Sequence, residues 1–161
     1  MKFINQKIGV FFWKLIVALP INFQNVLANI LFSFLKNPNL KRNIFSRKNI
    51  DAAFPNLNKQ EKINLFNKNL KSMIRGIFDT GKAWFWSDSK INSLIKYEIF
   101  GLNKLIATKG NLLIFKHSHH LELDSRILGM HCELYGVERV HNSSFMQKVQ
   151  SMGRLKGLNA L

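Results

Sequence analysis

Residues 115–130, FKHSHHLELDSRILGM, bring three histidines close to two acidic side chains. His117 and Glu122 are five residues apart, and so are His119 and Asp124. A carboxylate bonded to one ring nitrogen of a histidine fixes its tautomer and leaves the other nitrogen able to take a proton from a substrate hydroxyl. His117 with Glu122 is therefore a candidate for such a proton-abstracting pair, although His119 and Asp124 have the same spacing.

Two other interpretations fit the same residues. A solvated, polar start of a helix is also rich in such side chains. A metal site is the second alternative, because His131, Cys132 and Glu133 add further ligand types to the HSHH run. No standard zinc spacing is present, so we predict no metal ligands. Spacing alone does not decide between a catalytic pair and a polar helix start.

The segments around these residues alternate in their hydrophobic period. Residues 111–117 and 135–141 are short apolar runs typical of strands, whereas residues 120–134 and 144–155 have helical spacing. Strand, helix, strand and helix in this order predict an α/β fold with a parallel sheet. Ligands bind beyond the carboxyl ends of such strands, which is where His117 would lie.

Residues 59–80 have the pattern of one amphipathic helix. Asn58 and Glu61 have the spacing of a capping box. Apolar residues recur beyond them at helical intervals: Leu65, Phe66, Leu70, Met73, Ile74, Ile77 and Phe78. The aromatic run at residues 84–86, WFW, is typical both of a protein core and of a membrane interface.

The N-terminus contains two apolar runs, residues 8–19 and 21–35, separated by Pro20. Each is shorter than the roughly 20 residues that a spanning helix needs. We predict that residues 1–35 are a membrane anchor, either a tilted span or an interfacial helix, and that residues 36–161 form a separate α/β domain, of which only a part is present. A cleaved signal peptide and a pair of buried helices are the alternatives.

The chain is strongly basic, with 24 Lys and Arg against nine acidic residues and a net charge of +15. Such a charge predicts an anionic partner. No nucleic-acid-binding signature accompanies it, so we expect no nucleic acid. Basic residues that follow the apolar runs predict a cytoplasmic location for the rest of the chain: Lys36, Lys41, Arg42, Arg47 and Lys48.

Four stretches, NIDAAFPNL, FDTGKAWFWSD, KHSHHLEL and ERVHNSSFMQKVQSMGR, occur in an order that resembles the late acyltransferases of lipid A biosynthesis. TGKAWFWSD is similar to a TGMAWFWPD stretch of the lauroyl enzymes, and HSHHLE matches the His-x4-Glu or Asp motif of the family. The resemblance implies a membrane helix followed by the first βαβα part of a glycerolipid-acyltransferase-like domain. Members of the family are considerably longer, so it also implies that this chain is the N-terminal half.

The resemblance implies a role for individual residues. His117 would be the general base and Glu122 its orienting carboxylate. Arg154, within MGR, and Arg139, which alone matches a Y-R-P-x-x-N-P segment, would bind substrate. The reaction would move a lauroyl or myristoyl chain from acyl-acyl carrier protein to a hydroxyl of a Kdo-lipid A precursor, without a cofactor, at the cytoplasmic face of the bacterial inner membrane. The alternative is an inactive basic module that binds anionic lipid at the membrane surface.

Overall fold

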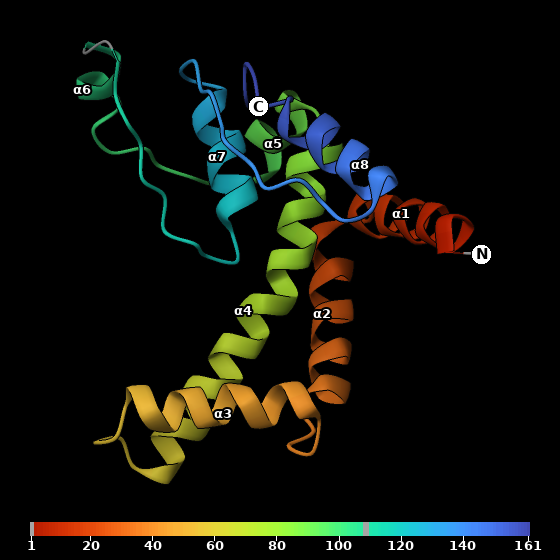
Figure 1. Ribbon diagram of the computed structural model, residues 1–161, viewed down its shortest axis with the longest axis vertical. Helices are drawn as coiled ribbons and strands as arrows, with labels where there is room; N and C mark the ends of the chain where they lie inside the picture. Colours follow the sequence, from red (N-terminus) through yellow and green to blue (C-terminus); the bar gives the residue numbers. More distant parts are fainter. Residues whose placement is uncertain (1, 108–109) are drawn as a thin grey trace. The chain divides into compact units, whose positions relative to one another are not determined.

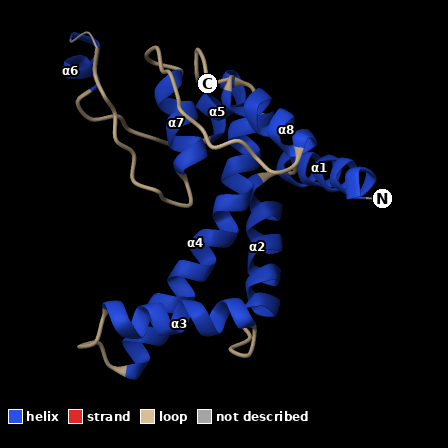
Figure 2. Cartoon of the chain, viewed as in Figure 1, coloured by secondary structure: helices blue, strands red, loops and turns tan. Residues whose placement is uncertain are grey.

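The computed structural model describes residues 2–107 and 110–161, and within these ranges it contains eight helices and no strand (Figures 1 and 2). The helices are α1 (Lys2–Ala18), α2 (Ile21–Leu35), α3 (Lys41–Ala53), α4 (Lys59–Phe85), α5 (Asp88–Leu94), α6 (Leu102–Ala107), α7 (Leu121–Gly129) and α8 (Ser144–Arg154). The predicted α/β fold with a βαβα segment is therefore wrong for the described chain.

The predicted helices of that segment form, but the predicted strands do not. Residues 111–117 and 137–141 are irregular, and the only pairing in the described ranges is an isolated parallel bridge between Tyr135 and Ala160. A strand requires a neighbouring strand to pair its backbone groups. The apolar side chains of the irregular segments are instead largely exposed, by 88% for Leu112 and 90% for Ile114.

The chain divides into two compact units. The terminal unit comprises Met1–Ala18 and Asp79–Leu161, and the middle unit comprises Leu19–Phe78. α4 contributes residues up to Phe78 to the middle unit and the remainder to the terminal unit. The residues predicted to do chemistry all belong to the terminal unit.

The two apolar N-terminal runs form separate helices, α1 and α2. Proline lacks an N–H group and clashes with the preceding turn, so helices do not continue through it, and Pro20 lies in the break. Many of their apolar side chains are exposed, among them Phe12 (56%) and Phe23 (62%). No helix in the described part of the chain is both long enough and apolar enough to cross a membrane, so the predicted transmembrane helix is not found.

The aromatic run at the end of α4 belongs to the core of the terminal unit. Trp84 and Trp86 are buried, and the indole N–H of Trp86 donates to the backbone oxygen of Val17 in α1 over 2.8 Å. Trp13 packs edge-on against Trp84 and Phe85, with ring centroids 5.4 and 5.2 Å apart. Of the two alternatives for this run, the structure supports the core.

The predicted capping box begins α4 in the middle unit. Asn58 Oδ1 accepts from the backbone N–H of Glu61 over 3.0 Å, and the Glu61 carboxylate accepts from the N–H of Asn58 over 2.8 Å. Four of the predicted apolar positions form a buried stripe at intervals of four residues: Phe66, Leu70, Ile74 and Phe78. The prediction of this helix is confirmed, although it extends to Phe85.

Candidate active site

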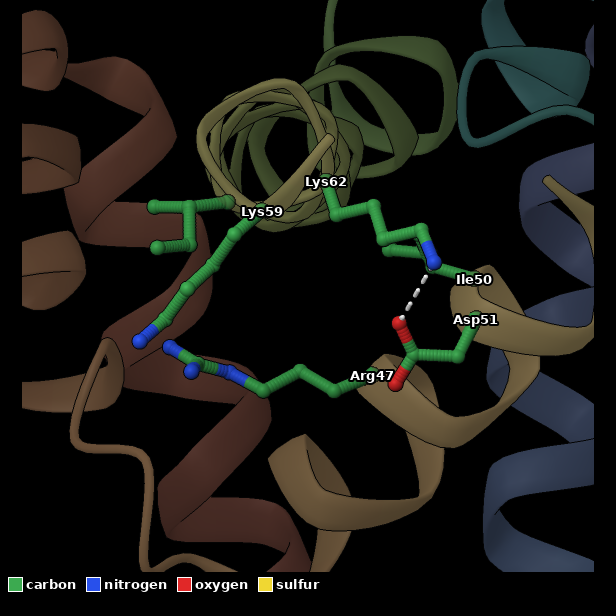
Figure 3. Close-up of a pocket in the computed structure, with 6 residues that line it drawn as sticks. Arg47, Ile50, Asp51, Lys59 and Lys62 are labelled. Atoms are coloured by element: carbon green, nitrogen blue, oxygen red, sulfur yellow. Dashed lines mark ion pairs between the residues drawn. The ribbon is translucent and has the colours of Figure 1, made fainter. Parts of the chain in front are cut away.

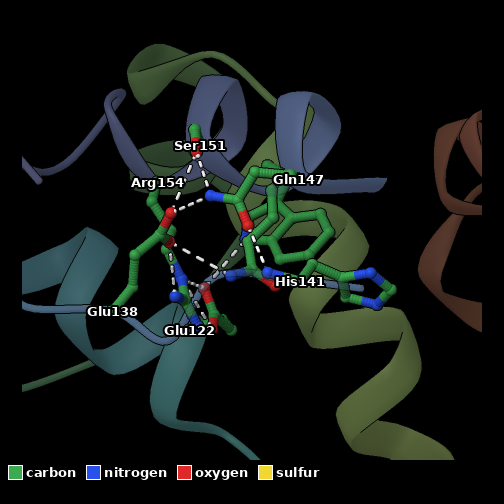
Figure 4. Close-up of polar contacts among 8 residues, drawn as sticks. Glu122, Glu138, His141, Gln147, Ser151 and Arg154 are labelled. Carbon is green, nitrogen blue, oxygen red and sulfur yellow. Dashed lines mark hydrogen bonds and ion pairs between the residues drawn. The ribbon is translucent and has the colours of Figure 1, made fainter. Parts of the chain in front are cut away.

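Glu122 lies in the first turn of α7 and is bound by side chains from two other helices. The Arg154 Nε atom, at the end of α8, donates to both carboxylate oxygens over 3.1 Å, and a terminal guanidinium nitrogen forms a second bond to Oε1. The indole N–H of Trp84 donates to Oε2 over 2.8 Å. The structure thus brings together two of the predicted site residues, Glu122 and Arg154 (Figure 4).

Arg154 also binds a second carboxylate, that of Glu138. Its Nη1 atom donates to Glu138 Oε2 over 2.7 Å, and the Glu138 side chain is only 9% exposed. Burial opposes ionisation of this carboxyl, but hydrogen bonds from Gln150, Arg154, Ser151 and Gln147 outweigh it and lower its pKa to about 2. Arg154 therefore bridges the carboxyl groups of Glu122 and Glu138, and each of them also accepts hydrogen bonds from other side chains.

α8 can approach Trp84 closely because residue 153 is glycine. Gly153 is buried, and a Cβ atom at this position would overlap the side chain of Trp84. This contact places Arg154 beside the indole N–H group of Trp84. Both groups donate hydrogen bonds to the Glu122 carboxylate. The cavity that remains at the Glu122 and Arg154 side chains has a volume of only about 10 Å³, enough for one water molecule at most.

Glu138 should make the terminal unit sensitive to acid. Its pKa in the folded chain, about 2, lies below the ordinary value of 4.5. Its contribution to stability is therefore complete above pH 4.5 and is lost as the pH falls towards 2. We expect urea denaturation to show a decline in the free energy of unfolding across this interval, and a smaller decline in Glu138→Gln. The exposed Glu133→Gln is the control; an equal acid response of all three proteins would contradict the assignment.

His117 and Arg139 lie apart from this cluster. Both side chains are exposed and stand on the irregular segments that were predicted as strands. No hydrogen bond or ion pair between His117 and Glu122 occurs in the described ranges, where the Glu122 carboxylate is bound instead by Arg154 and Trp84. The structure therefore joins Glu122 to Arg154 and leaves His117 and Arg139 at the surface.

A different histidine has a carboxylate partner. His120 Nδ1 lies 2.6 Å from Asp79 Oδ2, and the other oxygen of Asp79 accepts from Lys82 Nζ over 2.8 Å. His120 immediately precedes α7, and Asp79 lies 41 residues away in α4. Burial raises the pKa of the nearby Asp124 carboxyl group. The charge of His120 lowers this pKa, whereas the charge of Asp79 raises it further. Sequence reasoning did not assign a role to Asp79, although it stands within the FDTGKAWFWSD stretch.

A larger cavity, of about 600 Å³, lies next to the small cavity at Glu122 and Arg154. Trp84 and Gly153 line both cavities. Aromatic and other apolar side chains form much of the wall of the larger cavity: Val17, Ala18, Trp84, Phe85, Trp86, Val149 and Met152. Three lysines also line it: Lys14, Lys90 and Lys156. The Lys90 ammonium group lies 4.4 Å from the ring centroid of Trp86. The Lys14 ammonium group lies 5.2 Å from the ring centroid of Phe85. Such a cavity suits an apolar chain that ends in a polar or anionic group.

Within residues 2–107 and 110–161, no three side chains of His, Cys, Asp or Glu come together as metal ligands would. His131, which was considered as a ligand, lies 3.0 Å from the hydroxyl of Tyr97 through its Nε2 atom.

The sequence profile of the family described as bacterial lipid A biosynthesis acyltransferase matches residues 2–159. The chain belongs to this family. It is 34% identical over 155 residues to a lipid A biosynthesis acyltransferase of Haemophilus influenzae, an alignment that covers 92% of this chain and 49% of that protein. No solved structure matches the chain.

Two Escherichia coli proteins are also similar to this lipid A acyltransferase family member. The lipid A biosynthesis palmitoleoyltransferase is 30% identical over 125 residues, which cover 75% of this chain and 40% of that protein. The lipid A biosynthesis lauroyltransferase is 32% identical over 113 residues, which cover 68% of this chain and 36% of that protein. The chain therefore spans half or less of the length of the curated relatives it matches, and its similarity to them extends to proteins named for different acyl chains.

Proposed function

We propose that this lipid A acyltransferase family member transfers a lauroyl or myristoyl chain from acyl-acyl carrier protein to a hydroxyl of a Kdo-lipid A precursor. The observation that carries the proposal is the cavity of about 600 Å³ that adjoins Glu122 and Arg154. Ligand cavities of about 300 to 1,000 Å³ are typical of small-molecule sites. Its apolar wall suits the acyl chain, and its lysines suit an acidic carrier protein or an anionic acceptor.

The proposed chemistry is direct attack of the acceptor hydroxyl on the thioester carbonyl. His117 takes the hydroxyl proton as the new ester bond forms, and the carrier thiolate leaves as the thioester bond breaks. N–H groups in the first turn of α7 stabilise the negative charge that develops on the carbonyl oxygen. The His117 proton is then transferred to the departing thiolate, which regenerates the neutral imidazole.

The contact of Arg154 with Glu122 supports the role assigned to Arg154, and the roles of Glu122 and Arg139 are part of the proposal. Arg154 holds the Glu122 carboxylate in place, and Glu122 orients His117 in the substrate complex. Catalytic hydrogen bonds often tighten only in the substrate complex, so their absence before binding is compatible with this role. Arg139 is exposed on a neighbouring segment, and we assign it to the phosphates of the acceptor.

The membrane is the site where such an acceptor is found. We propose that the chain binds the cytoplasmic face of the bacterial inner membrane, with α1 and α2 lying in the interface. Exposed apolar side chains of both helices support this arrangement, and the net charge of +15 adds attraction to anionic lipid.

The direct test is an acyl-transfer assay on membranes that hold the intact chain. Lauroyl- and myristoyl-acyl carrier protein are supplied with a tetraacylated, Kdo-bearing lipid A precursor, and the product is resolved by mass spectrometry. We expect acylated product above the level of membranes without the chain. Absence of product from a folded, membrane-bound protein would reject the proposed activity for this chain.

One alternative has a specific observation in its favour. The exposed aromatic side chains of α2, Phe23 and Phe34, and the basic residues that follow them would serve an inactive module that binds anionic lipid. This alternative predicts membrane binding without transfer and no effect of His117→Ala on binding.

A further inference from the structure

A second cavity, of about 330 Å³, opens in the middle unit between α3 and the beginning of α4. Its lining residues are Arg47, Ile50, Asp51, Lys59, Lys62 and Ile63 (Figure 3). The lining thus has three basic side chains, one carboxylate and two isoleucines. None of these residues belongs to the proposed site of acyl transfer, which lies in the terminal unit.

The charges in this cavity are not evenly paired. The Lys62 ammonium forms an ion pair with Asp51 Oδ1 over 3.3 Å. Arg47 and Lys59 form no ion pair in the part of the chain that the structure describes, and Figure 3 shows their charged ends pointing toward one another, away from Asp51. Two cations that converge without a carboxylate between them attract an anion strongly, because both act on the same point.

Arg47 is also held in a fixed orientation with an unused donor. Its guanidinium carbon lies 4.6 Å from the ring centroid of Phe66, an arrangement in which the planar group is supported by the aromatic ring. Its Nε atom is buried and has no hydrogen-bond partner among the described residues. A buried N–H group without an acceptor is unfavourable. Arginine in this state is well suited to bind a phosphate through several N–H groups.

We propose that Arg47 and Lys59 bind a phosphate group in this cavity, and that the phosphate is that of an anionic membrane lipid. The lipid source is favoured by the apolar surroundings. Ile50 and Ile63 line the cavity, and exposed apolar side chains occur along α3, including Phe45 (56%). A soluble phosphate would use the two cations but not this apolar surface. The proposal does not depend on acyl transfer.

The test compares charge-removing variants of the full chain in binding to vesicles of phosphatidylcholine with and without phosphatidylglycerol. We expect Arg47→Gln and Lys59→Gln each to weaken binding to the anionic vesicles by about tenfold or more, because a charge-assisted hydrogen bond is lost. Lys48→Gln is the matched control, since Lys48 is exposed, follows Arg47 in α3 and does not line the cavity. Loss of one ordinary surface charge should weaken binding by about fivefold.

Lys59 is exposed, so Lys59→Gln keeps the test valid if Arg47→Gln unfolds. A second arm measures the melting temperature in inorganic phosphate. If inorganic phosphate raises the melting temperature of the parent protein but not that of Lys59→Gln, the phosphate site is supported and its source is a soluble phosphate. If the variants differ from the control only in vesicle binding, the lipid headgroup is supported. Equal losses for Lys48→Gln, Arg47→Gln and Lys59→Gln on vesicles, with no response to inorganic phosphate, would overturn the proposal.

Discussion

Replacing His117 by alanine should lower the rate of acyl transfer by about 100- to 10,000-fold, the range typical of the loss of a general base. The side chain is exposed and has no bond to Glu122 in the structure, so we expect no change in the free energy of unfolding. The measurement is initial-rate transfer from lauroyl-acyl carrier protein on membranes with equal amounts of each protein. A stable variant with the parent rate would exclude His117 as the base.

The competing pair of His120 and Asp79 provides the matched comparison. Its nitrogen–oxygen distance of 2.6 Å is that of an orienting contact, and Asp79 has a further bond from Lys82. If the pair is structural, His120→Ala and Asp79→Asn should lower the melting temperature and leave the transfer rate of the folded protein within a few-fold of the parent. A large loss of rate in both variants, with His117→Ala unaffected, would transfer the role of base to His120.

Helices α4, α7 and α8 could be predicted because their signals are local. The capping box and the four-residue apolar interval of α4 both lie within the helix or next to it, and the structure bears out both. In α7 the apolar residues Leu123 and Ile127 are buried four positions apart, and in α8 the Ser143 side chain caps the helix by accepting from the N–H of Met146 over 3.3 Å. Such features depend on neighbours three or four residues away, which the sequence displays directly.

The strands and the pairs of the site could not be predicted in this way. An apolar run such as residues 111–117 meets the local conditions for a strand, but strand formation depends on a partner that the run does not specify. The hydrogen bond from Trp84 to Glu122 joins residues that are 38 positions apart in the sequence. The hydrogen bond from Arg154 to Glu138 depends on where α8 packs in the folded chain. The motif around Glu122 marked it as functional, but only the three-dimensional structure shows that Arg154 binds it.

Arg154 should contribute substantially to the stability of the terminal unit. Its guanidinium bridges Glu122 and Glu138, whose side chains are 17% and 9% exposed. Removing one partner of a buried ion pair typically costs about 3 to 5 kcal/mol, and the 24% exposure of Arg154 should bring the loss for Arg154→Ala to that range's lower limit or below it. We expect urea denaturation to show a loss of about 2 to 3 kcal/mol, measured at pH 7.

Two comparisons separate loss of the bridge from simple loss of packing. Arg154→Lys retains the charge but not the planar fork that bonds both carboxylates at once, so its loss should be intermediate. Arg154 is one of the donors that lower the pKa of Glu138, so protonation of Glu138 in acid costs the parent more stability than it costs the variant that lacks this donor. The difference in stability between parent and Arg154→Ala should therefore shrink as the pH falls from neutral into the acidic range. A difference that is independent of pH would mean that Arg154 contributes packing and not charge.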